Sequence, residues 1–174
     1  MALIGAVVAV ADARPCHATG AETEAHLALS SDGHIGAWLV AGPFDHPRAP
    51  DEDGVAPRLG DATATTANAP RWRLASTSDG AVDIGGAIES RWYVGAFAAG
   101  VLHVEHAGRY YLLLGVGDAV TATVDGKRVL ARQEPRPEQD EDDLLALDLA
   151  AGDHPIVLAL HRYGLARSLR ARLL

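Results

Sequence analysis

The feature that most limits how this chain can fold is a two-residue alternation of apolar and polar side chains. It runs through residues 102–105, 120–124, 145–149 and 156–160. Successive side chains of a β-strand point to opposite faces, so each run predicts a strand with one buried face. The runs are short, and turn residues separate them at spacings of roughly ten residues. This spacing predicts an all-β protein built as an antiparallel β-sandwich.

Turn residues indicate where the strands end. Asp125-Gly126 favours a two-residue type I′ hairpin. A first strand is expected to begin at Ile35 and to stop at the turn pair Gly42-Pro43. Residues 72–74 and 82–84 are expected to form two further short strands.

Two segments are less regular. Residues 110–116 are apolar almost throughout, which predicts a central strand covered on both faces. Residues 165–174 fit a helix, because leucines recur at i, i+4 and i+8, and they also alternate as a strand does. A closing strand is favoured because it would cover an otherwise open sheet edge.

The amino-terminal region predicts an exported protein. Residues 2–11 form an apolar run that is too short to cross a bilayer, which needs about 20 residues. Small residues at 11 and 13 suit a signal peptidase, so residues 1–13 are interpreted as a signal peptide. A buried first strand is the alternative. Residues 14–34 are then a linker and residues 35–174 the sandwich domain, placed outside the cell, in the periplasm or at the cell envelope.

Charge and cysteine content exclude several functions. The 174 residues include 15 basic and 23 acidic side chains, a net charge of −8. An acidic surface repels nucleic acid and anionic lipid, so neither nucleic-acid binding nor membrane insertion is expected. Cys16 is the one cysteine, which excludes an intramolecular disulfide and a cysteine-rich zinc site.

Three segments resemble a known family. Trp38-Leu39-Val40-Ala41-Gly42-Pro43-Phe44 is similar to the opening of galactose-binding-like, jelly-roll β-sandwich modules. Residues 114–129 resemble the hairpin of these modules, and residues 142–160 resemble their closing strands. The resemblance begins at Ile35 and reaches the end of the chain. It implies that Trp38 packs inside, and that the chain serves as an accessory module of the kind attached to secreted bacterial hydrolases, transglutaminase-like proteins and helical-repeat proteins.

The chain departs from the family pattern at three positions. Asp125 stands where asparagine is usual, Gly117 replaces the first acidic residue of the hairpin, and His154 replaces the asparagine after the last turn. The fold itself carries many functions and supplies no reaction.

No catalytic centre is expected. The sequence contains neither a phosphate-binding loop nor a Gly-x-Ser-x-Gly elbow, and Cys16 lies in the expected linker. In the segment 103–106, the two histidines are three residues apart and point to opposite faces of a strand, so they do not suit one metal ion. His103 and Glu105 share a face, but a solvated surface is the favoured interpretation. The chain is therefore predicted not to be an enzyme.

Two acidic loops are the candidates for a metal. Asp51 and Asp53 lie in one, and Asp140 and Asp142 in the other. Calcium binds oxygen ligands from irregular loops, and jelly-roll modules often hold a structural calcium ion. Neither loop has alternating ligand spacing, so solvated charge is favoured. No other cofactor is expected.

Aromatic side chains are the candidates for sugar binding. Trp72, Trp92 and Tyr93 lie at the starts of expected strands, where an exposed ring could stack on a sugar face. Alternation implies that either Trp92 or Tyr93 faces outward, whereas burial in the core is the alternative for each ring. Asn68 is the one asparagine, which disfavours a conventional sugar site.

The sequence thus predicts a non-catalytic accessory module of a larger exported protein. Its expected partners are adjacent domains of the same polypeptide and a weakly bound glycan. The alternative is a purely structural or protein–protein interaction domain that packs on a neighbouring domain.

Overall fold

A computed structural model describes residues 26–27, 29–45, 72–77, 79–88, 94–117, 119–134, 143–162 and 168–174. Its strands are β1 (Ala37–Asp45), β2 (Arg73–Ser76), β3 (Ala81–Asp83), β4 (Val94–Val104), β5 (Gly108–Val116), β6 (Ala119–Val124), β7 (Lys127–Arg132), β8 (Asp143–Leu149), β9 (Gly152–Arg162) and β10 (Ser168–Leu173). One short helix, α1 (Ile84–Ala87), follows β3.

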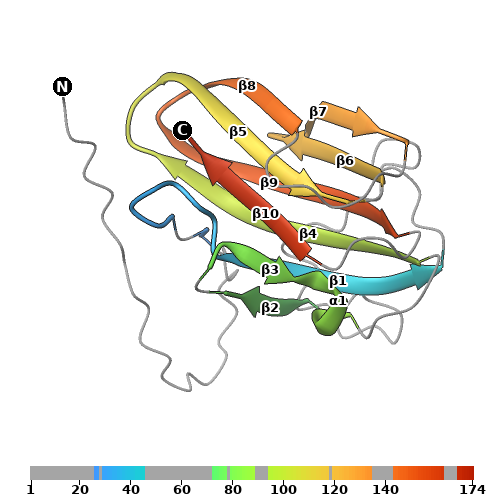
Figure 1. The fold of residues 1–174 in the computed structure, drawn as a ribbon. Helices are drawn as coiled ribbons and strands as arrows, with labels where there is room; N and C mark the ends of the chain where they lie inside the picture. The colour runs from blue at the N-terminus through green and yellow to red at the C-terminus, as the bar shows by residue number, and fades with distance from the viewer. Residues whose placement is uncertain are drawn as a thin grey trace, which may run out of the picture.

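The strands form two antiparallel sheets that face each other (Figure 1). The six-stranded sheet has the order β2-β1-β4-β9-β6-β7, and the four-stranded sheet has the order β3-β10-β5-β8. From β4 onward the chain passes repeatedly from one sheet to the other, as in a jelly roll. The predicted antiparallel β-sandwich is therefore confirmed.

The core lies between the sheets and consists of the alternate side chains that the sequence pattern marked as apolar. Trp38 of β1 is fully buried there, with Leu158 of β9 and Leu114 of β5. In β8 the leucines at 145, 147 and 149 are buried, and the residues between them are exposed. The period-two pattern thus located the inner face of this strand correctly.

The expected end of the first strand is wrong. β1 continues through Gly42-Pro43, whose peptide bond is cis, as far as Asp45. The register with β4 shifts between Ala41 and Phe44, so the pair is accommodated as an irregularity in the strand. Gly42 has a φ of 152°, and a Cβ atom there would lie 3.1 Å from the Gly95 carbonyl oxygen. The close backbone approach explains why glycine stands at this position.

Two expectations about exposure are also wrong. β5 is not covered on both faces, because Tyr111 on its outer face is 42% exposed. Conversely, β6 is buried throughout, and Thr121 on its outer face is only 1% exposed. Its cross-strand partner Ala159 and the nearby Ala99 on the same face are buried as well.

The strand expected over residues 82–84 ends one residue early. The Asp83 carboxylate accepts a hydrogen bond of 2.8 Å from the Gly86 backbone N–H and so caps α1.

The prediction of a closing strand is confirmed, since β10 pairs with both β3 and β5. The predicted hairpin is confirmed as well, because Asp125 and Gly126 have φ values of 52° and 71°.

Residues 26–27 and 29–35, most of which fall in the expected linker, contact the sandwich. The Leu27 N–H donates a 2.8 Å hydrogen bond to the Val101 carbonyl oxygen, and the Leu27 side chain is buried in the core. It lies over Gly100, where an added Cβ atom would come within 2.2 Å of Leu27 Cδ2. A glycine on β4 thus makes room for a side chain from this segment.

Candidate functional site

Most of the residues predicted to form a site lie outside the described residues. This is true of Trp92 and Tyr93, and of the calcium candidates Asp51, Asp53, Asp140 and Asp142. Trp72 is described. It immediately precedes β2 and is partly buried, and its indole N–H is buried without a hydrogen-bond partner among the described residues.

Exposed apolar side chains gather on the outer face of the four-stranded sheet. Tyr111 pairs with Ala146 of β8, and its backbone exchanges two hydrogen bonds with Leu174. Leu113 pairs with Leu144. Leu144 and Leu174 are 63% and 55% exposed. We call this contiguous set the outer patch: Tyr111, Leu113, Leu144, Ala146 and Leu174.

An ion pair borders the outer patch. Arg109, two residues before Tyr111 on the same face, pairs with Asp148 across β5 and β8. Arg109 Nε donates to one Asp148 oxygen and Nη2 to the other, each at 2.8 Å. These hydrogen bonds raise the pKa of Arg109 and lower the pKa of Asp148. Both side chains are well exposed, so the pair adds little stability and stays open to solvent.

Alternation in β5 turns the Tyr111 ring outward. Its neighbour Tyr110 faces the core, and the Tyr110 hydroxyl donates a 2.7 Å hydrogen bond to the His106 carbonyl oxygen. Sequence reasoning missed Tyr111 because the apolar run 110–116 suggested a strand buried on both faces. The charged Arg109 could have indicated that Tyr111 is exposed, because residues two positions apart on a strand lie on the same face.

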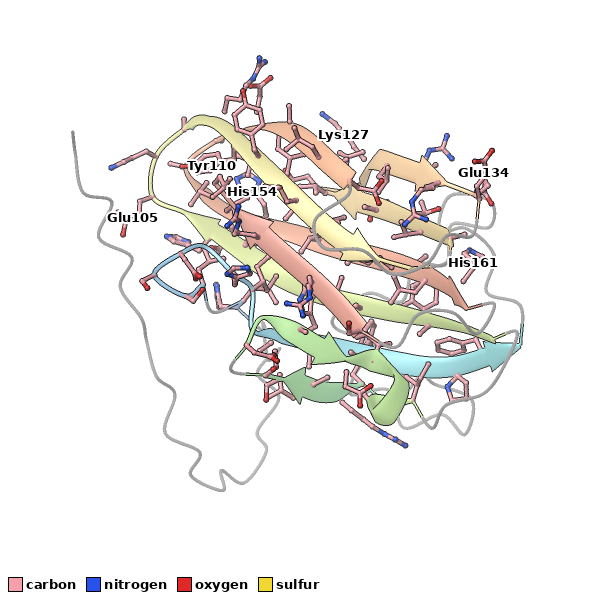
Figure 2. All side chains as sticks on the ribbon, in the orientation of Figure 1. Glu105, Tyr110, Lys127, Glu134, His154 and His161 are labelled. Atoms are coloured by element: carbon pink, nitrogen blue, oxygen red, sulfur yellow. The ribbon has the colours of Figure 1, made fainter. Side chains whose placement is uncertain are left out.

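A second group of polar side chains lies at the hairpin end of the sandwich, where turns join β4 to β5, β6 to β7 and β8 to β9. His154 is buried there (Figure 2). Its Nδ1 lies 2.7 Å from Asp125 Oδ2, and its Nε2 lies 2.9 Å from the Ala150 carbonyl oxygen. Burial lowers the pKa of His154, but the two hydrogen bonds and the nearby carboxylates outweigh it and raise the pKa overall.

Both ring nitrogens of His154 lie next to hydrogen-bond acceptors, so this side chain serves to hold the structure together. A carbonyl oxygen and a carboxylate both accept hydrogen bonds, which requires a proton on each ring nitrogen. The imidazolium therefore joins the β6–β7 turn to the β8–β9 turn.

The other histidines at the hairpin end do not form a metal centre. His103 Nδ1 lies 2.5 Å from Asp153 Oδ1, and His26 Nδ1 lies 3.9 Å from the same oxygen. Within the described residues, no group of three or more histidine, cysteine, aspartate or glutamate side chains is arranged to hold a metal ion.

Arg132, at the end of the sandwich opposite the hairpin end, also holds strands together. Arg132 Nη2 donates to the Val116 carbonyl oxygen at 2.6 Å, and Nε donates to Asp143 Oδ2 at 3.2 Å. The Arg132 and Asp143 side chains are only 12% and 11% exposed. This buried pair ties the end of β7 to the start of β8 and offers little to a ligand.

Comparison with known proteins identifies the architecture of this chain but assigns it to no family. No protein family matches the sequence, and no curated protein matches it. A β-glucosidase from Kluyveromyces marxianus matches in structure at 10% identity with a TM-score of 0.52, over 78% of this chain and 16% of that chain. An anti-sigma factor domain-containing protein from Clostridium clariflavum matches at 16% identity with a TM-score of 0.51, over 93% of this chain and 47% of that chain. The likeness shows a β-sandwich fold.

The chain thus spans less than half the length of either matched structure. At these identities the comparison shows the fold alone, so the function rests on the side chains of this chain. No helix in the described part of the chain is long and apolar enough to span a membrane.

Proposed function

We propose that this chain is a non-catalytic accessory module of a larger exported protein, and that it binds a glycan weakly on the outer face of its four-stranded sheet. The observation that carries this proposal is the exposed ring of Tyr111 beside the exposed Arg109–Asp148 pair. A sugar presents an apolar C–H face and polar hydroxyls, and this site offers an aromatic ring and a charged pair side by side.

The expected affinity is low, because the site is a sheet face open to water. Stacking on an aromatic ring is worth about 1 kcal/mol beyond the buried area. Hydrogen bonds to exposed groups replace hydrogen bonds to water and add about as much each. A module of this kind would serve to keep a neighbouring domain near a polysaccharide, where many weak sites act together.

The polar side chains support a binding role and not catalysis. His154 is held by acceptors on both ring nitrogens, and Arg132 is buried in its ion pair, so neither is placed to act on a substrate. Asp148 is exposed and its pKa is lowered, whereas a catalytic acid needs a shielded carboxyl group with a raised pKa.

Affinity electrophoresis against neutral polysaccharides tests the proposal. We expect migration to slow in a gel containing a bound polymer, and Tyr111→Ala to abolish the effect. Leu74→Ala is the matched control, because Leu74 is 69% exposed on β2 of the other sheet. A Tyr111→Ala protein that is retarded as strongly as the unaltered chain would refute the site.

The second candidate function is packing on an adjacent domain of the same polypeptide. The exposure of Leu144 and Leu174 favours it, because contiguous exposed apolar side chains mark protein interfaces. If this is correct, joining the chain to its neighbour will lower the hydroxyl-radical labelling of the exposed Leu144 and Leu174 side chains, and glycan will have no effect on migration.

A further inference from the structure

We infer that two copies of this chain pair antiparallel through β8, with Ala146 of each copy at the two-fold axis. The pairing uses the side of β8 that faces away from β5, which we call the open edge. The inference goes beyond the proposed function, because the pairing of the strands needs no glycan. It follows from the backbone groups and the side chains of β8, and from how the other sheet edges are protected.

Among the described residues, the two sheets have four edge strands, and three of these carry features that prevent pairing with another chain. β2 and β3 are short, with four and three residues. β7 begins with the exposed Lys127 and Arg128. β8 has seven residues, none of them lysine, arginine or proline, and is bonded to β5 alone (Figure 1). β8 is therefore the edge that most readily accepts a further strand.

The backbone groups of Leu144, Ala146 and Asp148 point to the open edge. Tyr111 exchanges both of its backbone hydrogen bonds with Leu174, so these groups of β5 are directed away from β8. Tyr111 and Ala146 are therefore a non-hydrogen-bonded pair of the β5–β8 ladder. The two kinds of pair alternate along an antiparallel ladder, so the residues two positions before and after Ala146 have the same orientation.

One register uses all three of these residues. With the two-fold axis at Ala146, this residue lies opposite the partner's Ala146, and Leu144 lies opposite the partner's Asp148. Each such pair is hydrogen-bonded and exchanges two N–H···O bonds. A shift of the register by two residues would lose one of the pairs within residues 143–149. The outer faces stay on the same side, so the two four-stranded sheets become one continuous sheet.

The side chains along the open edge suit this pairing. Ala146 is small, so the two alanines at the axis can approach closely. Leu144 is 63% exposed in the single chain, and the partner strand would cover part of it. Arg109 neutralises Asp148 through two hydrogen bonds, so the edge brings no unbalanced charge to the contact. Two copies can therefore approach here although each carries a net charge of −8.

Pairing would also align the two proposed glycan sites. Tyr111 is the cross-strand neighbour of Ala146, so both tyrosines and both alanines would lie in one row across the joined sheet. The row covers three strand spacings, which places the two tyrosines about 14 Å apart. This consequence rests on the proposed function: a glycan chain that touches both rings would be held more tightly than by one ring.

Disulfide cross-linking tests the register. Cys16 is the one native cysteine, so the variants are made together with Cys16→Ser. Ala146→Cys should form a covalent dimer, because the Cα atoms of a hydrogen-bonded pair lie about 5.5 Å apart, within the span of a disulfide. Leu144→Cys and Asp148→Cys should each remain monomeric alone and cross-link when mixed. Leu74→Cys, at an exposed position on β2, is the matched control and should give no dimer.

Sedimentation equilibrium of the unaltered chain measures the pairing without an added cysteine. We expect the average mass to rise with protein concentration from 18.2 kDa towards twice that value. The rise should be larger in about 0.5 M salt, because the net charges of the two copies are then screened.

Two substitutions at the axis should abolish the rise in mass. Ala146→Pro removes an N–H that points to the open edge, and an edge strand tolerates proline at such a position. Ala146→Lys places two like charges opposite each other. Leu74→Lys adds the same charge on the other sheet and should leave the rise unchanged. Equal thermal melting of the three variants would show that each remains folded.

The outcomes separate the pairing from the glycan site. Cross-linking of the mixed Leu144→Cys and Asp148→Cys proteins, together with a mass that rises with concentration, supports the inference. A chain that stays monomeric, a Leu144→Cys protein that cross-links with itself, or a dimer that survives both Ala146 variants overturns it. Failure of every polysaccharide to bind overturns the glycan site and leaves the pairing, which is measured without sugar.

Discussion

Replacing His154 with leucine should destabilise the sandwich in a pH-dependent way. The substitution removes the donors to Asp125 and to the Ala150 carbonyl. A hydrogen bond to a charged group contributes about 1.5–3 kcal/mol and a neutral one about 1 kcal/mol. Asp125 is partly exposed and regains water, so we expect a loss of about 2–3 kcal/mol in the free energy of unfolding at pH 5.5.

The sign of the pH dependence follows from the pKa of His154, which is raised in the folded chain above its ordinary value of 6.5. The folded state therefore binds the proton more tightly than the unfolded state does. The resulting stabilisation is complete below pH 6.5 and is lost as the pH rises through the folded pKa. The difference between the unaltered chain and the His154→Leu variant should therefore be largest in acid and smaller at pH 8.5.

Urea unfolding followed by tryptophan fluorescence, at pH 5.5 and at pH 8.5, measures this difference. His103→Leu is the control, because the His103–Asp153 pair is exposed and should contribute under about 1 kcal/mol. If His154→Leu lowers the free energy of unfolding equally at both pH values, the imidazolium does not join the two turns and the reasoning is wrong.

Four other predictions can be checked by thermal melting. Gly100→Ala should lower the free energy of unfolding by about 1–3 kcal/mol, because its Cβ would collide with Leu27. Gly108→Ala should be nearly neutral by the same thermal melt, since the nearest atom to a Cβ there is 3.8 Å away. Asp143→Ala should cost about 1.5–3 kcal/mol, because it removes the charged hydrogen bond between the largely buried Arg132 and Asp143 side chains. Calcium and EDTA should leave the melting temperature unchanged, because the acidic loops lack alternating ligand spacing; a clear rise in calcium would instead show a bound ion.

The sequence predicted the layers of this fold better than their outer surfaces. Alternating leucines in β8 marked its inner face, and Asp125-Gly126 marked its hairpin, because both signals are local. Whether an outer face is covered depends on segments distant in sequence. Thr121 is buried and Tyr111 is exposed, although both lie on the outer face of their sheet.

The candidate site was harder to predict for a related reason. Arg109 and Asp148 are 39 residues apart and become neighbours through the register of β5 with β8. A pattern search along the chain weighs residues close in sequence, so it favoured Trp92 and Tyr93 and passed over this pair. Predicting the register first, and then listing exposed aromatic residues beside cross-strand charges, would have identified Tyr111.

The position of Leu27 has a practical consequence for anyone who prepares this domain. A recombinant fragment that starts at Ile35 would match the boundary suggested by the alternating pattern, yet it would omit a side chain that fills the interior above Gly100. The empty volume would be lined by apolar atoms and would reduce stability, as a large-to-small core substitution does. Fragments should therefore begin before His26.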